Sequence, residues 1–583
     1  MAKTAEYHFL SGGADGVNFW KTQGSSLSKK QGRFTKKYKA APLLCAANIQ
    51  GKDSWRMVVG TATGDLYLYD EREVCDGVEG AHKGPVLCLA EGGEECTFLV
   101  SGGRDHLVKV WNQAMQPISV FDVSPFSVVD ASVASLDVRP ADPHNPSALT
   151  LLVGTYGGEI IELSAEKGSS HGNKKGGDAG GAGEHRNLDL SHSTADVLLH
   201  SHYSGELWGL APHPLDPDVY ATVGDDKTLR IWSIRGNCLL KAQPLHWPAR
   251  CVAWHPLGTA LAVGFHESTK GGQKGAAKGK GTASAAPAAA KGKSTVPKNA
   301  AKRNSAAAEE GEDGGGDNIY ESGGGGSSAG AGDTTHKGAI HLYSFHKPSN
   351  GRIEIKKRAD GCTSLAWIND IKFSPDGRVL LAGSHDKRLY AFDIPELSSG
   401  DASNDTVWEP WTHCLDKAKY EFNKHSSAVL HVDFTLDGRY FQTNCQAAEL
   451  LFGAVDTGRQ ETSATKLADY NGQLEDDPEL EGRQWASQTC KLGWTVQGIW
   501  PPGADTTDIN SVDRSADGKL LATADDFGNV KLFRFPCAQD ASKFLSYGGH
   551  SSHVTNVRWT TANQLLSVGG NDKCVFVWSM SEK

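Results

Sequence analysis

Several chemical signatures are missing from this chain of 583 residues, and each absence excludes a class of protein. Its twelve cysteines stand singly, without a CxxC pair, which argues against a zinc ribbon and against a disulfide framework. No run of 18 apolar residues occurs, and the opening MAKTAEYHFL holds no apolar signal core. A net charge of −10 argues against specific nucleic-acid binding, which normally needs a basic domain. These absences predict a soluble intracellular protein with reduced thiols and no membrane span.

Motifs for catalysis are also missing. There is no serine elbow and no His-Glu-x-x-His, and no cluster of metal ligands stands out. The GKST at 292–295 is not a phosphate-binding loop, because Pro287 stands where that loop needs its first glycine. The acid pairs at 225–226 and 525–526 are interpreted as turn residues. The sequence therefore predicts no enzyme, no cofactor, no metal and no small-molecule substrate.

What the chain does contain is a repeated cadence of strand, Gly-Asp turn and strand. It occurs as FLVSGGRDHLVKVWN (98–112), YATVGDDKTLRIWS (220–233), LLAGSHDKRLYAFD (380–393) and LLSVGGNDKCVFVWS (565–579). In each copy an aspartate precedes the closing aromatic residue by six positions: Asp105 and Trp111, Asp226 and Trp232, Asp386 and Phe392, Asp572 and Trp578. Such repeats resemble WD repeats, in which each unit forms one four-stranded blade of a β-propeller.

The number of repeat units indicates more than one propeller. A partial unit at 8–21 is followed by nine units, near 42–71, 80–112, 134–165, 200–234, 246–346, 364–394, 422–455, 484–535 and 549–580. One ring usually has four to eight blades. We therefore predict an all-β fold of tandem β-propellers built of WD repeats, the first incomplete. Residues 1–125 are expected to form the C-terminal blades of a truncated first propeller, and 126–583 a second propeller of about seven blades.

Within the units, some residues fit the buried hydrogen-bond network of a WD blade. Such a network satisfies polar groups that would each cost about 1–3 kcal/mol if buried without a partner. In the last unit Val568 stands at the hydroxyl position, and in the 364–394 unit Ala382 does so. The residues predicted to form this structural network are His82, Ser101, Asp105, Trp111, His202, Thr222, Asp226, Trp232, His550, Asp572 and Trp578.

Two low-complexity stretches do not belong to the blades. Residues 166–187 form a Gly-rich loop, and 267–337 form a long insertion with few bulky apolar residues. The insertion cannot bury enough apolar surface to offset its ordering entropy, so we predict that it is disordered. It is basic first and acidic afterwards, with six acids and no base from 309 to 321. Its cations are Lys270, Lys274, Lys278, Lys280, Lys291, Lys293, Lys298, Lys302 and Arg303.

The insertion interrupts one repeat unit, between the strands at 260–265 and 338–345. In a WD blade the matching turn opens on a face where partners dock, so we expect a flexible arm on a propeller face. Its unopposed cations are candidates for contact with an anionic partner: tubulin tails, acidic lipid or nucleic acid. The alternative is an insertion that only keeps the protein soluble.

The last 150 residues carry a more specific pattern than the repeat alone. The string GIWP, DINSVDRS, DDFG and PC within 485–537 closely resembles the echinoderm microtubule-associated protein-like family. Further matching segments follow in the same order along nearly the whole chain: GSSLSKKQGRF (24–34), GAHKGPVLCL (80–89), VSGGRDHLVKVW (100–111), SGELWGLAPHP (204–214) and FSPDGRVLLAGSHDKRLYAF (373–392).

This resemblance implies a tandem pair of atypical propellers that binds tubulin and associates with microtubules. It implies a place in the cytoplasm and cytoskeleton, with a cilium or flagellum suggested by family association. Family members carry further blades and a hydrophobic motif ahead of the GSSLSKKQG segment, and this sequence does not contain them. The basic arm is then expected to supply a contact of its own. The alternative function is a WD scaffold that joins other proteins through its faces, in a ciliary complex for example, without touching tubulin.

Overall fold

The computed structural model describes most of the chain outside the low-complexity stretches. It describes residues 9–13, 16–23, 26–35, 37–50, 55–70, 72–93, 96–139, 149–165, 190, 193–266, 338–348, 352–397, 405–463, 466–467, 484–501 and 508–580. The basic arm cations, the Gly-rich loop and the acidic stretch of the insertion all lie outside these residues. No helix in the described ranges is long and apolar enough to cross a membrane.

The repeated cadence folds into antiparallel strands joined by tight turns. In all four copies the residue after the turn aspartate has a positive φ, namely His106, Lys227, Lys387 and Lys573. This left-handed conformation reverses the chain directly into the next strand. Because apolar residues alternate on both sides of the turn, each hairpin presents apolar side chains to its neighbours. The prediction of an all-β fold of WD repeats is therefore confirmed.

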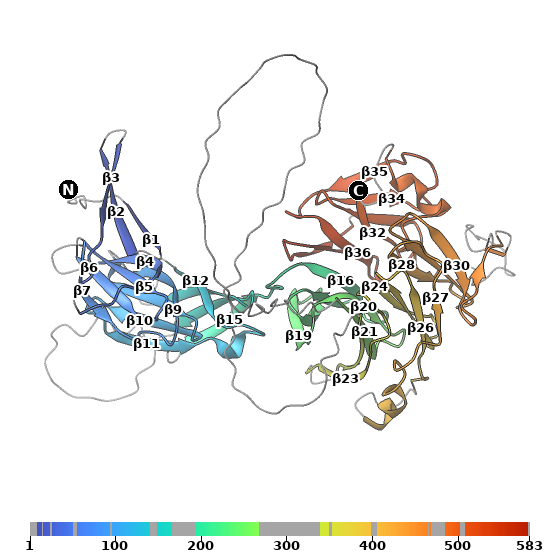
Figure 1. The fold of residues 1–583 in the computed structure, drawn as a ribbon, viewed down its shortest axis with the longest axis horizontal. Helices are drawn as coiled ribbons and strands as arrows, with labels where there is room; N and C mark the ends of the chain where they lie inside the picture. The colour runs from blue at the N-terminus through green and yellow to red at the C-terminus, as the bar shows by residue number, and fades with distance from the viewer. Residues whose placement is uncertain are drawn as a thin grey trace, which may run out of the picture. The chain divides into compact units, whose positions relative to one another are not determined.

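Ten antiparallel sheets follow one another along the described chain, one for each predicted repeat unit. The first four form an N-terminal array, coloured blue to teal in Figure 1. Its strands are β1 (Phe9–Gly13), β2 (Gly16–Gln23), β3 (Ser26–Gln31), β4 (Leu43–Gln50), β5 (Trp55–Thr61), β6 (Leu66–Asp70), β7 (Glu73–Val78), β8 (Val86–Gly92), β9 (Phe98–Gly103), β10 (Leu107–Asn112), β11 (Pro117–Asp122), β12 (Val133–Val138), β13 (Thr150–Thr155), β14 (Ile160–Ala165) and β15 (Ser193–Leu199).

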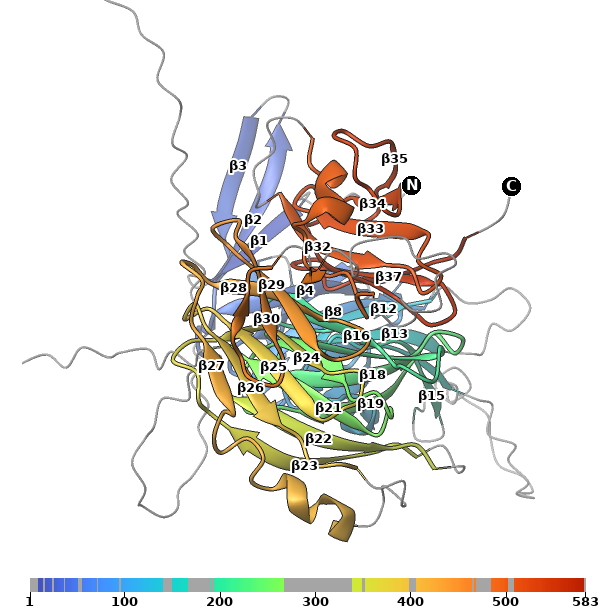
Figure 2. The same ribbon diagram turned by 90° about the vertical axis from the view of Figure 1, so that its right-hand side faces the viewer.

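The other six sheets form a C-terminal ring, coloured green to red in Figure 1 and seen from its own side in Figure 2. Its strands are β16 (Leu207–Pro212), β17 (Val219–Gly224), β18 (Thr228–Ser233), β19 (Cys238–Pro244), β20 (Ala249–Trp254), β21 (Ala260–Phe265), β22 (Ile340–His346), β23 (Glu354–Gly361), β24 (Ile368–Phe373), β25 (Val379–Ser384), β26 (Leu389–Asp393), β27 (Tyr420–Phe422), β28 (Val429–Phe434), β29 (Tyr440–Cys445), β30 (Leu450–Ala454), β31 (Gln460–Glu461), β32 (Ile509–Arg514), β33 (Leu520–Asp525), β34 (Val530–Arg534), β35 (Phe544–Tyr547), β36 (Val554–Trp559), β37 (Leu565–Gly569) and β38 (Val575–Trp578). Three 3₁₀ helices complete the described elements: η2 (Ser124–Phe126), η4 (Asp405–Trp411) and η6 (Trp494–Ile499).

The apolar core of each lobe lies between neighbouring sheets. In the array, one cluster joins Val100 of β9 to Val133 of β12 and Ile161 of β14. The sheet β12–β15 therefore packs on β8–β11. Sequence spacing led us to draw the boundary at residue 125 and to assign this sheet to the second propeller. The contacts instead group it with the blades before it and leave six sheets in the ring, because spacing along the chain does not reveal which sheets become neighbours.

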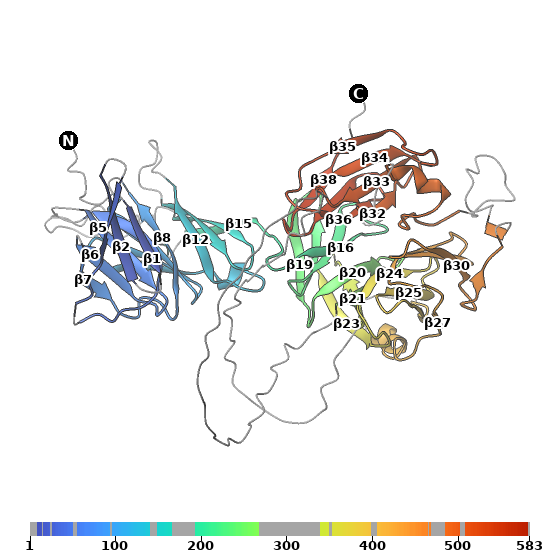
Figure 3. The same cartoon turned by 45° about the horizontal axis from the view of Figure 1, so that its top comes forward.

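The ring closes between its first and last sheets. The Thr555 hydroxyl donates to the carbonyl of Leu207 at 2.6 Å, and the Asn556 amide donates to the carbonyl of Trp208 at 3.1 Å. The backbone N–H of Leu207 donates to the carbonyl of Gly570. The two side-chain bonds each join residues separated by 348 positions, and all three bonds hold β16 against β36 and β37. Figure 3 shows β16 and β36 near each other in a third view.

A bridging segment, residues 484–501, lies between the sheets β28–β31 and β32–β35. On one side its Trp485 pairs with Thr435 next to β28. On the other side the Lys491 ammonium donates to the carbonyl of Ile509, and the Arg514 guanidinium donates to the carbonyl of Trp485. The sequence analysis counted this stretch as part of a blade, but its only regular element is η6.

The long insertion lies between two strands that pair with each other. Strands β21 and β22 are antiparallel neighbours, with Gly264 opposite Ile340. The blade is complete without the 71 residues of 267–337. This is the position that the sequence analysis assigned to the arm.

Candidate functional site

The blade β8–β11 contains the predicted hydrogen-bond network. His82 Nδ1 lies 2.7 Å from Asp105 Oδ1, and His82 Nε2 lies 2.7 Å from Ser101 Oγ. Trp111 Nε1 donates to the same Ser101 oxygen at 2.7 Å. Burial lowers the pKa of His82. The structure thus brings all four residues together in a closed chain with no ring nitrogen left to face a substrate.

The blade β16–β19 repeats this arrangement and adds a charge. His202 bridges Asp226 at 2.7 Å and Thr222 at 2.8 Å, and Trp232 Nε1 donates to Thr222 at 2.7 Å. The guanidinium of Arg230 is fully buried 3.5 Å from Asp226. Within the described chain its two terminal nitrogens have no hydrogen-bond partner. Asp226 is therefore the counter-charge of a buried cation as well as a member of the network.

In the last blade the network uses a serine that sequence reasoning missed. His550 contacts Asp572 at 3.0 Å and Ser567 at 2.8 Å, and Trp578 Nε1 donates to Ser567 at 2.8 Å. We had placed Val568 at the hydroxyl position, because the hydroxyl precedes the aspartate by four residues in the other two blades. This turn is one residue longer, so the hydroxyl precedes Asp572 by five. The strand register gives the signal: Ser567 lies opposite Val557, as Ser101 lies opposite Leu89.

In the 364–394 unit the turn aspartate is hydrogen-bonded by other side chains. Ala382 does stand at the hydroxyl position, opposite Ile371. The Asp386 carboxylate accepts hydrogen bonds from the hydroxyls of Tyr390 at 2.7 Å and Ser364 at 3.1 Å. In all four blades, therefore, the conspicuous aspartate hydrogen-bonds to neighbouring side chains and stabilises the turn.

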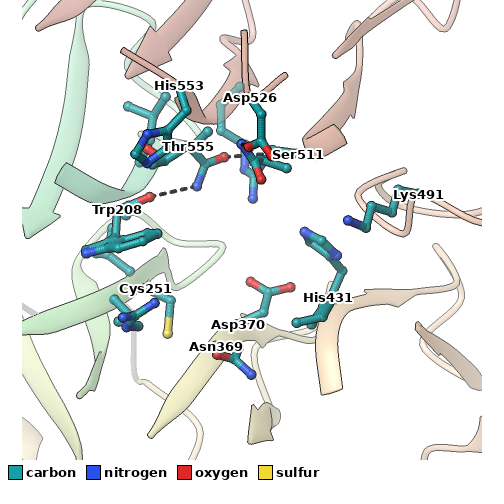
Figure 4. Close-up of a pocket in the computed structure, with 18 residues that line it drawn as sticks. Trp208, Cys251, Asn369, Asp370, His431, Lys491, Ser511, Asp526, His553 and Thr555 are labelled. Carbon is teal, nitrogen blue, oxygen red and sulfur yellow. Dashed lines mark hydrogen bonds between the residues drawn. The ribbon is translucent and has the colours of Figure 1, made fainter. Parts of the chain in front are cut away.

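The open space in the ring is a central channel of about 520 Å³ (Figure 4). The first strand of every sheet in the ring contributes to its wall, so the side chains in Figure 4 converge from β16, β20, β24, β28, β32 and β36. The labelled residues that point into it are Trp208, Cys251, Asn369, Asp370, His431, Lys491, Ser511, Asp526, His553 and Thr555. The channel is a product of ring closure, since no two neighbouring blades would enclose it.

Buried charges of both signs lie around the channel. Burial raises the pKa of Asp370 and of Asp513, although Lys372 and Arg558 oppose that shift at Asp370. Desolvation lowers the pKa of His431, which is only partly buried, to about 3. Its Nδ1 has no hydrogen-bond partner among the described residues. The wall therefore combines the cations Arg250, Lys491 and Arg558 with the carboxyl group of Asp370, whose pKa is raised by burial.

A second cavity of about 240 Å³, which we call the mouth, continues the channel. It shares five wall residues with the channel: Arg250, Asn369, Leu430, Lys491 and Asn510. Its other wall residues are Trp367, His385, Asn444, Cys445, Gln446, Ala448 and Leu492. Among these described wall residues two are permanent cations and none is a carboxylate. The mouth is therefore suited to an acidic partner group.

Aromatic rings hold Arg250, one of the two cations of the mouth, in place. The Arg250 guanidinium lies 4.1 Å from the ring of Trp208 and 5.5 Å from the ring of Trp367. Trp367 also stacks on His266 and contacts His385, with ring centroids 4.8 Å and 4.0 Å apart. His266 is the last described residue before the arm. The last described residue before the arm therefore contacts Trp367, a wall residue of the mouth.

The sequence analysis missed the channel and mouth entirely. Their residues come from six strands spread over some 350 positions, and no local spacing joins them. The one available signal was the interrupted hairpin at 260–265 and 338–345, which marked the correct end of one blade. The candidate arm cations, Lys270 to Arg303, lie outside the described residues.

Two kinds of family model match the chain. The model described as "Echinoderm microtubule-associated protein second beta-propeller" matches residues 334–580. The model "WD domain, G-beta repeat" matches residues 74–112 and 195–233. These two WD matches contain every member of the networks of His82 and His202.

Curated relatives match over nearly the whole chain. The human protein "Echinoderm microtubule-associated protein-like 2" is 31% identical over 572 residues, which is 97% of this chain and 65% of the relative. The mouse protein "Echinoderm microtubule-associated protein-like 1" is 24% identical over 583 residues, covering 97% of this chain and 52% of the relative. "Echinoderm microtubule-associated protein-like 4" of Xenopus tropicalis is 25% identical and is covered over 49% of its length. The chain thus spans from about half to about two thirds of these relatives.

Proposed function

Because the chain belongs to the echinoderm microtubule-associated protein-like family, we propose that it is a non-enzymatic scaffold of the microtubule cytoskeleton that binds tubulin or microtubules. The observation that carries this proposal is the relation to named microtubule-associated proteins over 97% of the chain. The proposed location is the cytoplasmic cytoskeleton. A ciliary or flagellar site is part of the same proposal.

The mouth and the arm support an acidic partner. The mouth presents Arg250 and Lys491 without a carboxylate in its described wall, and the sequence of the arm supplies nine further cations. Tubulin tails are acidic and flexible, so they can reach a recessed cationic cavity. Two weak contacts on one partner strengthen each other through their effective concentration. We therefore propose the mouth and the arm cations as two separate contacts for an acidic partner.

Deletion of the arm is expected to weaken microtubule binding. We expect the full chain to co-sediment with polymerised microtubules at low salt, and a variant lacking residues 268–337 to bind several-fold more weakly. Added salt should remove most of that difference, since screening over about 10 Å at 0.1 M suppresses contacts between flexible charges. Microtubule affinity that is equal for both chains at low salt would contradict the assignment of the arm.

Arg250 is expected to matter for binding of an acidic peptide to the mouth. R250Q keeps a polar, planar end group but removes the charge between the two tryptophans. We expect it to lower the affinity for a glutamate-rich tubulin-tail peptide about tenfold or more, as judged by fluorescence anisotropy, since a desolvated charged contact is worth about 1.5–3 kcal/mol. The matched control is K543Q, which removes an exposed cation ahead of β35. Equal losses in both variants would leave only net charge as the cause.

The second candidate function is a scaffold that joins other proteins without touching tubulin. The net charge of −10 favours it, because long-range repulsion from an acidic lattice must be overcome locally. Absence of microtubule binding at low salt, for the full chain, would favour this function over the first. The networks of His82, His202 and His550 support the non-enzymatic part of both, since each imidazole is engaged at both nitrogens.

A further inference from the structure

The blade β28–β31 lacks the turn aspartate that Asp105, Asp226, Asp386 and Asp572 provide in four other blades. Cys445 of this blade lies opposite Val429, as Gly103 lies opposite Val86 in the blade β8–β11. By this register Ala447 stands where Asp105 stands, since both follow that position by two residues. The network histidine is present as His425. It precedes Val432, which faces Thr443, by seven residues, just as His82 precedes Leu89, which faces Ser101, by seven residues.

The cysteine points at this histidine. At the equivalent Gly103, an added Cβ would overlap the imidazole of His82 and the carboxylate of Asp105. Cys445 places a side chain at that point, and Ala447 leaves room for it. The carboxylate is replaced from another position, Glu449. One imidazole, one thiol and one carboxylate therefore converge in this turn.

The three ligand atoms lie close together. His425 Nδ1, Cys445 Sγ and a Glu449 oxygen all lie within 4.8 Å of one another. His425 Nδ1 is 3.5 Å from Glu449 Oε2, and Cys445 Sγ is 3.2 Å from the same oxygen. A tetrahedral zinc ion, with bonds of about 2.0–2.3 Å, holds nitrogen and oxygen ligands about 3.4 Å apart, and sulfur and oxygen about 3.6 Å apart. The nitrogen–oxygen and sulfur–oxygen distances of the cluster lie within a few tenths of an ångström of these values.

The imidazole has no other partner to explain its position. The His425 side chain is fully buried, and neither ring nitrogen makes a hydrogen bond within the described chain. Thr443 occupies the strand position at which Ser101 and Thr222 bind the histidine Nε2 in the other blades. Its hydroxyl also has no hydrogen-bond partner within the described chain. A buried polar group without a partner is costly, so a buried, unpartnered imidazole suggests a missing ligand.

A second turn shows how a hydroxyl and a carboxylate at the same two positions pair when no histidine is present. In the blade β12–β15, Thr155 and Glu159 occupy the positions of Cys445 and Glu449, and the Thr155 hydroxyl donates to the Glu159 carboxylate. That pair closes the turn by a hydrogen bond alone. Serine at position 445 would reproduce this closed turn, so a cysteine beside an unpartnered histidine needs a further reason.

We propose that His425, Cys445 and Glu449 form a Zn²⁺ site, with water as the fourth ligand. On binding, the Cys445 thiol loses its proton to solvent, and zinc–sulfur, zinc–nitrogen and zinc–oxygen bonds form. Ser426 holds the Glu449 carboxylate through its N–H at 2.9 Å and its hydroxyl at 2.8 Å, which orients the carboxylate ligand. With zinc on Nδ1, Nε2 carries the proton that Thr443 can accept.

The protonation states are suited to metal capture. Burial lowers the pKa of His425, so its nitrogen lone pair is available at pH 7. The hydrogen bonds from Ser426 lower the pKa of Glu449 to about 2. Burial raises the pKa of Cys445, so the thiol keeps its proton until a metal displaces it. Zinc affinity is therefore expected to rise as the pH rises.

The site is reached from the ring. Cys445 is a wall residue of the mouth, together with Asn444, Gln446 and Ala448 of the same turn. The Glu449 side chain is 35% exposed, which leaves an entry path to an otherwise buried cluster. Bound zinc would add positive charge beside the mouth. The proposal does not depend on tubulin binding.

The test uses the full chain and metal alone. Zn²⁺ is titrated in competition with a chromophoric chelator, and Co²⁺ is used as a probe because a cobalt–thiolate bond gives an ultraviolet charge-transfer band. We expect one equivalent of Zn²⁺ and one Co²⁺ site with that band. C445S keeps the hydrogen bond of the turn but should lower zinc affinity about 100-fold or more and abolish the band, since even the loss of a group supporting a ligand costs about 10–100-fold. E449Q and H425Q should each weaken binding.

The control is C238S, which removes an exposed cysteine outside the cluster. Zinc should slow hydrogen exchange in the blade β28–β31 of the wild-type chain and of C238S but leave that of C445S unchanged. If the wild-type chain binds no stoichiometric zinc, or if C445S binds as tightly as wild type, the proposal is overturned. Because C445S retains the fold of a Thr155-type turn, loss of binding with an unchanged circular dichroism spectrum identifies a lost ligand.

Discussion

Replacing Asp433 with alanine is expected to lower the free energy of unfolding of the C-terminal ring by about 3–5 kcal/mol, because it removes one partner of a buried charge pair. Asp433 is fully buried on β28 and lies 2.7 Å from the Lys372 ammonium. The hydroxyls of Ser487 and Thr489 and the N–H of Cys490 also donate to its carboxylate, at 2.6–2.9 Å. The change would therefore leave a half-buried cation and several donors of the bridging segment without their acceptor.

The effect should be local to one joint of the ring. We expect hydrogen exchange to speed up first in residues 484–501, because Asp433 binds that segment to β28. The matched control is D540N, which changes an exposed aspartate and should leave both exchange and melting unchanged. Unaltered exchange in the bridging segment of D433A would contradict this account.

The pH dependence of this contribution has a definite sign. Lys372 and the surrounding donors hold the pKa of Asp433 below its ordinary value. A group whose pKa is lower in the folded protein stabilises it fully above the unfolded pKa, about 3.9, and loses that effect as the pH falls. The difference in stability between wild type and D433A should therefore shrink on acidification below about pH 4.

Replacing Asp226 with alanine is the second large change. It leaves the buried guanidinium of Arg230 without its counter-charge, so we expect the free energy of unfolding to fall by about 3–5 kcal/mol. The blade β8–β11 supplies a comparison within the same chain. There Asp105 has the same network, but the cation at the matching place, Lys109, donates to the carbonyl of Ala81 at 2.5 Å. D105A should cost only about 1–3 kcal/mol, the cost of unsatisfied buried donors.

Peptide-resolved hydrogen exchange during thermal unfolding measures both variants in their own blades, since the chain has several lobes and one global midpoint is not well defined. We expect protection of β16–β19 to fall more in D226A than protection of β8–β11 falls in D105A. Restoration of D226A by the second change R230M would identify the stranded charge as the cause. Equal effects in the two blades would show that Arg230 plays no part.

The blades could be predicted from sequence because their determinants are local. An alternating strand, a Gly-Asp turn and an aromatic residue six positions later specify one hairpin in each of four units, and the ten predicted repeat units correspond to ten sheets. The same reasoning misplaced the hydroxyl of the last blade, since one extra residue in the turn moved it from 568 to Ser567. A count along the chain does not detect that shift, whereas strand register does.

Non-local features were beyond the same reasoning. The union of Lys372, Asp433 and Thr489 spans three segments, and each residue alone has the appearance of an ordinary surface residue. The wall of the channel depends on ring closure, and the assignment of β12–β15 depends on which apolar faces meet. His425 and Cys445 belong to one blade, but twenty positions separate them, and their convergence follows only from the register of β28 with β29.

The closure of the ring through Thr555, Asn556 and Leu207 has a consequence for synthesis on the ribosome. The first strand of the ring leaves the ribosome some 348 residues before its partner is made. At about 5–20 residues per second this interval lasts roughly 17–70 s. During that time β16 presents an apolar edge that only the last blade can cover. We expect chaperones to bind nascent chains at 207–212, and to be released only when residues 554–578 have emerged.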